Sequence, residues 1–364
     1  MDITEDFYSQ LCFADGTMVA PQNKAEIKNH PSDFEVNEKM NVELSGDGEH
    51  IWLQITKIGQ HTDQVAKKLA RLADISPKHI GFSGMKDYRA KTTQWFSVWL
   101  PGAKDENLPD WSLLNSQEIQ VNQVQRHSRK LKRGTHDGNY FDIWLRNFTG
   151  DKQLLIEKLT EICHQGVPNY FGEQRFGRGG SNLQQAIVML NSGKRYKQRQ
   201  KRSVLLSSVR AWLFNLVLSE RLKNNTWLQP YPGEPLNLTG SKQFFIAEDL
   251  KDAKLRLENK DLHTTAPLWG LGVEKIMKEA AELNDFESSI IDRQVDFKNG
   301  LEKEKLDYAR RSTRCLPEKL IWEFQENRQS KLFDLQISFF LPKGQFATSV
   351  LREVILERRE FVSN

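Results

Sequence analysis

Cysteine is scarce in this sequence, and metal-binding patterns are missing. The chain of 364 residues has three cysteines, Cys12, Cys163 and Cys315, which lie far apart and form no CxxC pair. An odd, scattered set of thiols is typical of reduced cysteines in a cytoplasmic protein, which argues against a disulfide framework. The eight histidines form no HxxxH or HExxH pattern, and we therefore predict no metal site.

Long apolar runs are also missing. The N-terminus, MDITEDFYSQ, is acidic and lacks the apolar core of a signal peptide. The most apolar long stretch, residues 204–218, is interrupted by two serines and by Arg210, so it is not a membrane span. We therefore expect a cytoplasmic protein with no membrane partner.

The sequence has no large excess of charge of one sign. Its 52 Lys and Arg residues against 48 Asp and Glu leave a net charge of +4, which is too small to indicate a polyanionic partner by itself. Hydrophobic residues at 38% and charged residues at 27% are typical of a soluble globular protein. At roughly 150 residues per domain, the length predicts two domains.

Strand patterns occupy both ends of the chain. Alternation of apolar and polar residues predicts strands over residues 50–56, 93–100, 140–145 and 335–341. Helical spacing after Thr62, a predicted N-cap, and over residues 349–356 predicts helices.

Helical patterns fill the middle of the chain. Ser203 is predicted to cap a helix that reaches residue 222, and charged helical stretches follow over about residues 247–260 and 274–287. A helical, charge-rich middle between strand-rich ends predicts one domain inserted into another.

Residues 81–95, GFSGMKDYRAKTTQW, contain a single acidic residue, Asp87. Asp87 stands between Lys86 and Arg89 on a predicted loop between two strands, a common place for functional residues. A turn alone would also explain an Asp there. The two cations would keep the carboxylate, whose reference pKa is about 3.9, ionised. An ionised lone carboxylate can act as a nucleophile without an activating base, whereas most glycoside hydrolases need a second carboxylate.

Two basic runs could contact phosphates. Residues 126–134, RHSRKLKRG, include Arg129 and Lys130, and residues 194–202, KRYKQRQKR, include Lys194 and Arg195. The second run precedes the predicted helix start at Ser203, where the helix dipole disfavours cations, so an anionic partner would explain its position. A solvated surface, or disorder in the second run, remains an alternative.

A third segment mixes glycines, aromatics and arginines. Residues 167–182, VPNYFGEQRFGRGGSN, include Arg175 and Arg178. Glycines allow the backbone to approach a ligand closely, but the spacing matches neither a P-loop nor a dinucleotide fingerprint. A loop at a domain junction would also explain the segment.

Together these motifs resemble a known family. The pattern GxKDxxAxTxQ over residues 84–94 resembles the signature of the TruD family of tRNA pseudouridine synthases. Other blocks resemble the same family in the same order: the N-terminal block from Lys28 through DFxVxE at 33–38, GEH at 48–50, HxRKL at 127–131, GNxF at 138–141, NYFGxQRFG at 169–177 and FATSxxRE at 346–353.

The resemblance implies an α+β fold. It predicts a catalytic core of mixed, mostly antiparallel sheet with flanking helices, interrupted by a family-specific α/β insertion. On this basis we expect core residues 1–165, an inserted domain at 166–320, and the rest of the core at 321–364.

The resemblance also implies the roles of individual residues. Asp87 corresponds to the catalytic aspartate. Asn139, Phe141 and Phe346 are expected to line the pocket around the target uracil, and Lys28 and Lys86 to pair with or orient Asp87. The weaker expected RNA contacts are Arg129, Lys130, Arg175, Arg178, Lys194 and Arg195.

The implied reaction is the isomerisation of an extruded uridine to pseudouridine, which needs no cofactor and no metal. The implied partner is tRNA, with uridine 13 of the D arm as the usual target and glutamate tRNA as the typical substrate. We expect a monomer. A non-catalytic RNA-binding or tRNA-folding protein, or a base-releasing glycosidase, would use a similar surface, and only the product distinguishes them.

Overall fold

The computed structural model describes residues 23–192, 196, 198–241, 243–327 and 330–358. The chain divides into two compact units. The first, called here the sheet unit, holds the described residues within 23–156, 317–345 and 355–358. The second, called here the helical unit, holds those within 157–316 and 346–354.

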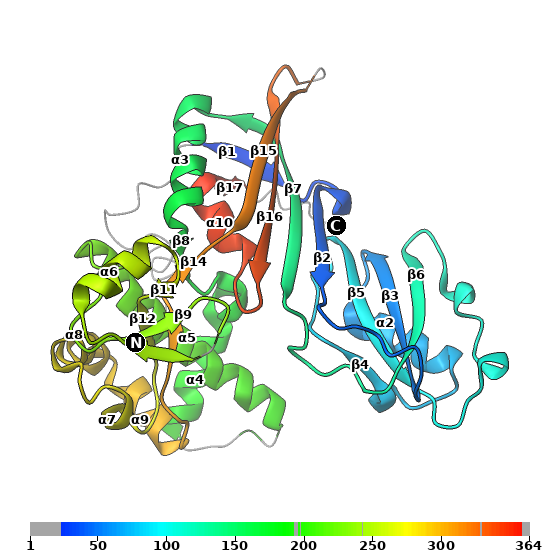
Figure 1. Ribbon diagram of the computed structural model, residues 1–364, viewed down its shortest axis with the longest axis horizontal. Helices are drawn as coiled ribbons and strands as arrows, with labels where there is room; N and C mark the ends of the chain where they lie inside the picture. The colour runs from blue at the N-terminus through cyan, green and yellow to red at the C-terminus, as the bar shows by residue number, and fades with distance from the viewer. Residues whose placement is uncertain (1–22, 193–195, 197, 242, 328–329, 359–364) are drawn as a thin grey trace. The chain divides into compact units, whose positions relative to one another are not determined.

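Within the described residues, the sheet unit is built on one ten-stranded sheet in the order β15-β16-β7-β2-β5-β3-β6, with β1, β4 and β17 paired at its sides (Figure 1). β1 pairs with β17 and β2 with β5 in parallel, and the other pairs are antiparallel. This confirms the predicted α+β fold with a mixed, mostly antiparallel sheet. The strands are β1 (Lys24–Ile27), β2 (Phe34–Lys39), β3 (His50–Ile58), β4 (Ile80–Phe82), β5 (Lys91–Trp99), β6 (Ile119–His127), β7 (Gly138–Thr149), β15 (Glu318–Glu326), β16 (Phe333–Pro342) and β17 (Leu356–Arg358).

The predicted strands all lie in this sheet, and alternation explains their burial. Ile51, Leu53 and Ile55 share one face of β3 and are fully buried against Leu69 of α2 (Thr62–Leu72). Trp52 on the opposite face is buried as well, in a separate cluster. Both faces of β3 are therefore covered.

The start of α2 lies one residue from the prediction. His61 is the N-cap, and its backbone N–H donates to the side chain of Gln64 at 3.2 Å. The predicted cap, Thr62, is the first helical residue, and its buried hydroxyl donates to Gln94 of β5 at 2.9 Å instead. The prediction of Thr62 as N-cap was wrong because this hydroxyl is used in a tertiary contact. The 3-10 turns of the sheet unit are η1 (Pro31–Asp33), η2 (Pro77–His79), η3 (Asp105–Asn107) and η4 (Trp111–Leu114).

The helical unit is organised around α5 (Arg199–Lys223), whose Val209, Leu213 and Val217 are fully buried in its core. The other helices are α3 (Lys152–Gln165), whose first residues belong to the sheet unit, α4 (Ser181–Ser192), α6 (Leu250–Glu258), α7 (Val273–Ile276), α8 (Ala281–Ile291), α9 (Val295–Lys303) and α10 (Ala347–Val354), with the 3-10 turns η5 (Glu173–Arg175), η6 (Arg178–Gly180) and η7 (Asp292–Gln294). The short strands are β8 (Val167–Pro168), β9 (Pro235–Leu238), β10 (Phe244–Ile246), β11 (Leu262–His263), β12 (Thr265–Leu268), β13 (Ala309–Ser312) and β14 (Arg314–Cys315).

The start of α5 also differs from the prediction. The helix begins at Arg199 with Gln198 as its N-cap, so Ser203 lies within it rather than capping it. The basic run therefore does not end before the helix, because Arg199, Lys201 and Arg202 belong to its first turns. Lys194 and Arg195, the predicted RNA contacts of this run, lie outside the described residues.

Candidate active site

Asp87 lies on the loop between β4 and β5, and buried side chains hold the backbone of that loop. The Lys86 backbone N–H donates to the Thr62 hydroxyl at 3.0 Å, and the Gln94 side chain donates to the Gly84 carbonyl at 3.1 Å. Thr62 and Gln94, which bond to each other, are both fully buried. The Lys-Asp pair of the GxKD motif is thus anchored to α2 and β5.

The Asp87 carboxylate is held as an anion. Burial alone would raise its pKa, but the Lys28 ammonium, which forms an ion pair and hydrogen bond with Oδ2, and the Arg89 backbone N–H, 3.0 Å from Oδ1, lower the pKa below the ordinary value for Asp. Lys28 directly follows β1 and has a φ of 61°, a left-handed conformation that few residues other than glycine adopt. Lys28 adopts this conformation where the chain leaves β1, and its side chain reaches the Asp87 carboxylate.

A second lysine beside Asp87 was missed in the sequence. Lys57 of β3 is fully buried, and its ammonium donates to the Asp87 backbone carbonyl at 2.9 Å. Burial lowers the pKa of Lys57 to about 8, with Asp87 raising it and Lys86 lowering it further. The available signal was that Lys57 continues the alternating series of Ile51, Leu53 and Ile55 on one face of β3.

Lys86 points to other partners than Asp87. Its ammonium lies 2.9 Å from the Glu38 carboxylate and 2.5 Å from the side-chain oxygen of Asn139, to which it donates. The side chains of Lys86 and Glu38 are almost fully buried. Lys86, the residue before Asp87, thereby connects the Asp87 loop to Asn139 of β7 and to Glu38 of β2.

Aromatic rings lie beside Lys28. Its ammonium is 4.2 Å from the ring centroid of Phe34, and the Phe34 ring meets Phe141 edge-on at 6.2 Å. Phe141 is half-buried and also stacks on Phe339 of the neighbouring strand at 5.4 Å. The sheet unit therefore brings together Asp87, Lys28, Lys86, Asn139 and Phe141.

Phe346 belongs to the helical unit. It directly precedes α10 and packs near Phe171, with ring centroids 6.2 Å apart, and near the guanidinium of Arg311. That Phe346 lines the uracil pocket stays a prediction.

The weaker predicted RNA contacts differ in their surroundings. Arg129 and Arg178 are exposed. The Lys130 ammonium donates to the Lys78 carbonyl at 2.7 Å, and Arg175 donates to the Ser207 hydroxyl at 3.1 Å. Arg129 and Arg178 are thus the more accessible to a phosphate.

Chemically, the sheet unit presents an ionised carboxylate at Asp87, with the Lys28 ammonium on its Oδ2 and the Lys57 ammonium on the backbone carbonyl of the same residue. The Phe34 ring lies beside Lys28. Such a carboxylate can attack an electrophilic carbon or accept a proton. In the part of the chain that the structure describes, no cluster of three or more His, Cys, Asp or Glu side chains could hold a metal ion, and no helix is long and apolar enough to cross a membrane.

Comparison with known proteins identifies the family. A family model described as tRNA pseudouridine synthase D (TruD) matches residues 17–184 and 182–354. The tRNA pseudouridine synthase D of Nitrosococcus oceani is 43% identical over 337 residues, covering 92% of this chain and 91% of that protein. The protein of the same name from Hydrogenovibrio crunogenus is 37% identical, covering 95% of this chain and 96% of its own length.

A solved structure agrees on the fold. The crystal structure of a protein from Methanosarcina mazei, described as tRNA pseudouridine synthase D (TruD), superimposes with a TM-score of 0.73 at 19% identity, covering 97% of this chain and 99% of that one. Together, the family match and the relatives show that this chain belongs to the TruD family of tRNA pseudouridine synthases, isomerases that convert uridine to pseudouridine.

Proposed function

We propose that Asp87 is the single catalytic carboxylate with which this chain isomerises a uridine of tRNA, and that the target is uridine 13 of the D arm. The observation that carries the assignment of Asp87 is its position on the anchored loop, ion-paired with Lys28. Position 13 and glutamate tRNA as the typical substrate come from the family resemblance.

The reaction changes one bond to the sugar. The N1–C1′ bond breaks, the uracil turns within the pocket, and a C5–C1′ bond forms. C5 loses its proton, and N1 gains one, so atoms and electrons balance without an oxidant or reductant. Asp87 would either attack C1′ and leave again when C5 bonds, or remove the C2′ proton to form a glycal and later return it. Both routes start from the ionised carboxylate.

The neighbours of Asp87 support this chemistry. Lys28 and the Arg89 backbone N–H keep the carboxylate ionised, and Lys57 holds its backbone carbonyl. The target uridine has to leave its stack, at a cost of a few kcal/mol. We propose that Phe141 and Asn139, together with Phe346, contact the extruded base, and that Arg129, Lys130, Arg175, Arg178, Lys194 and Arg195 contact phosphates.

The product tests the reaction class. Unmodified glutamate tRNA transcript is incubated with the protein and pseudouridine is mapped at single-nucleotide resolution, while free uracil is measured in parallel. We expect pseudouridine at position 13 and no free uracil. Free uracil would indicate a base-releasing glycosidase, and tRNA that binds without any modification would indicate an RNA-binding protein without catalysis.

We also propose that residues 166–320 form the family's inserted domain, and that the protein acts in the cytoplasm as a monomer. The helical composition of this middle segment supports the first proposal, and light scattering coupled to gel filtration tests the oligomeric state.

A further inference from the structure

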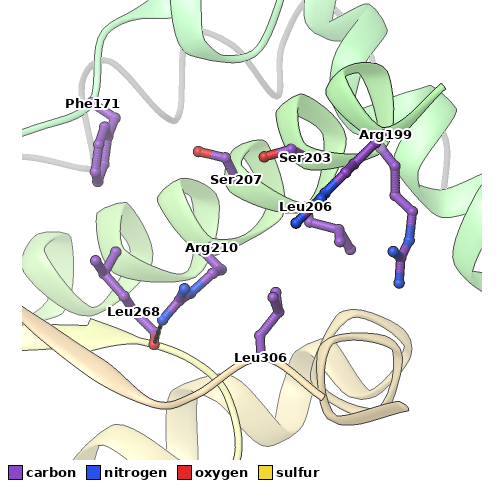
Figure 2. A pocket seen from close by; sticks show the side chains of 9 residues that line it. Phe171, Arg199, Ser203, Leu206, Ser207, Arg210, Leu268 and Leu306 are labelled. Carbon is purple, nitrogen blue, oxygen red and sulfur yellow. Dashed lines mark hydrogen bonds between the residues drawn. The ribbon is translucent and has the colours of Figure 1, made fainter. Parts of the chain in front are cut away.

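The helical unit holds a cavity of about 290 Å³ along one face of α5 (Figure 2). Arg199, Ser203, Ser207 and Arg210 line it from the first three turns of the helix, at spacings that place them on one side. Phe171 and three leucines form the apolar part of its lining. The cavity therefore combines cations and hydroxyls with an apolar wall.

The cations of this cavity are poorly compensated. The Arg210 guanidinium donates through Nη2 to the carbonyl oxygens of Leu268 at 2.6 Å and Asp307 at 2.8 Å, as Figure 2 shows for Leu268, while its buried Nε has no hydrogen-bond partner among the described residues. Burial lowers the pKa of Arg210, and Asp307 only partly offsets this. Arg210 is thus a half-buried cation bound to carbonyls rather than to a carboxylate.

Arg199 in the lining and Arg175, which bonds the lining residue Ser207 without lining the cavity itself, add to the positive charge. Arg175 donates to the hydroxyl of Ser207, and burial lowers the pKa of this arginine too. Arg199 is exposed and forms no ion pair with a described residue. Arg202, also at the cavity, is neutralised by Glu304. A partly buried cation that bonds only neutral acceptors, as Arg210 does, is costly, and an anion that enters the cavity would reduce that cost.

The apolar wall limits what else can bind. Phe171 is buried, and the Arg311 guanidinium already lies 4.2 Å from its ring centroid. The Phe171 ring therefore forms part of the cavity lining and is not free to stack on a base. The cavity volume lies just below the range of about 300–1,000 Å³ that is usual for ligand pockets, which leaves room for one nucleotide and not for a length of strand. Hydroxyls such as Ser203 can hydrogen-bond a sugar or phosphate oxygen.

We propose that this cavity binds one nucleotide unit of the RNA strand, with its phosphate at Arg199 and Arg210 and its sugar and base against the leucines. This rests on the proposed function, because it takes the strand to be tRNA. Contacts of this kind position an RNA without reading its sequence. The cavity is thus a second contact point, which lies within the helical unit and is built from residues other than those around Asp87.

The test places a carboxylate in the cavity. Ser203→Glu adds negative charge between the arginines, and Val204→Glu makes the same change at the neighbouring α5 residue, which is 43% exposed and does not line the cavity. Both variants are made in Asp87→Asn protein so that tRNA binds without turnover, and tRNA affinity is measured over a range of salt concentrations. Circular dichroism confirms that both variants are folded.

We expect Ser203→Glu to weaken tRNA binding at least tenfold relative to Val204→Glu. We also expect Arg199→Ala to lower the slope of log affinity against log salt concentration by about 0.7–0.9, the loss of one phosphate contact. Lys298→Ala is its control, because Lys298 of α9 lies outside the basic run and is already paired with Asp292 at 2.6 Å. Equal tRNA affinities for Ser203→Glu and Val204→Glu would overturn the cavity proposal and leave the proposed function standing. Parent protein that fails to bind tRNA would contradict the proposed function itself.

Discussion

At the scale of single residues, the charge state of Asp87 is set by its neighbours. Burial disfavours the carboxylate, but Lys28, the Arg89 backbone and Lys57 together outweigh burial and lower its pKa. Both proposed routes of uridine isomerisation start from the ionised carboxylate of Asp87. The residues that contact Asp87 therefore affect the reaction through the charge of this carboxylate.

Removing Lys28 should weaken catalysis. Lys28→Met removes a hydrogen bond between charged groups, which contributes about 1.5–3 kcal/mol, so kcat/KM should fall about 10- to 150-fold. The acid limb of the pH profile should also move to higher pH. Lys91→Met is the control, since Lys91 forms a similar ion pair, at 2.7 Å, with Glu35 instead. If the two variants had equal activity, Lys28 would not act through Asp87.

The pH dependence has two predicted parts. Because the pKa of Asp87 is lowered in the folded protein, its ionised form persists below the ordinary Asp pKa, and Asp87 should produce no acid limb between pH 5 and 7. Lys57 has a pKa of about 8, below its ordinary value of 10.5. Its charge beside Asp87 is therefore present below pH 8 and lost above it, and kcat/KM should fall above pH 8.

Lys57 also has an effect on stability with the opposite sign. The unfolded chain binds the Lys57 proton up to about pH 10.5, and the folded chain releases it near pH 8, so the Lys57 contribution to stability rises with pH between these values. Lys57→Met should abolish the alkaline limb in activity and flatten this rise, measured by urea unfolding at pH 7.5 and 10. An alkaline limb that persists unchanged in Lys57→Met would assign it to another group.

At the scale of elements, the Asp87 loop depends on α2 and β5. Gln94 is buried and bonds both Gly84 and Thr62, so Gln94→Leu removes this partner from the half-buried Gly84 carbonyl and from the buried Thr62 hydroxyl. The loss at Thr62 costs about 1–3 kcal/mol. We expect lower stability and a larger fall in kcat than in the affinity for tRNA. Gln125→Leu on β6, whose side chain bonds only weakly to Leu44 at 3.4 Å and to Gln123, serves as control. A Gln94→Leu enzyme with normal kcat would show that the loop needs no such anchor.

Element boundaries show how far sequence reasoning reaches. Alternation located β3, β5, β7 and β16, because burial of at least one sheet face is visible as a period of two. The starts of α2 and α5 were misplaced, because the capping rules favoured Thr62 and Ser203. In the folded chain the Thr62 hydroxyl serves a tertiary contact, and α5 begins within charged residues.

At the scale of the whole molecule, a net charge of +4 does not by itself explain tRNA binding, so local clusters of cations have to supply it. Arg129 is exposed and forms no ion pair with a described residue. Arg129→Ala should weaken tRNA binding and lower the salt slope by about 0.7–0.9. Lys298→Ala, which removes a lysine already paired with Asp292 at 2.6 Å, should change the slope much less. Equal slopes would exclude Arg129 as a phosphate contact.

The candidate site was predictable to the extent that it is local in sequence. Asp87 and its loop are adjacent along the chain, so the GxKD pattern was enough to single them out. The partners of Asp87 are Lys28, which directly follows β1, and Lys57 of β3. Both are distant in sequence, and only the fold brings Lys28 to the carboxylate and Lys57 to the backbone carbonyl of this residue. Without the fold, Lys57 is one lysine among the many cations of a nearly neutral chain.

The most direct test of Asp87 as the single catalytic carboxylate is one single-turnover experiment. Excess wild-type or Asp87→Asn protein is mixed with unmodified glutamate tRNA, and bound tRNA and pseudouridine are measured from the same samples over time. We predict that the variant binds tRNA within about tenfold of wild type, a difference of about 1.4 kcal/mol, yet forms no detectable pseudouridine. Pseudouridine formation by Asp87→Asn at a rate near that of wild type would contradict the assignment.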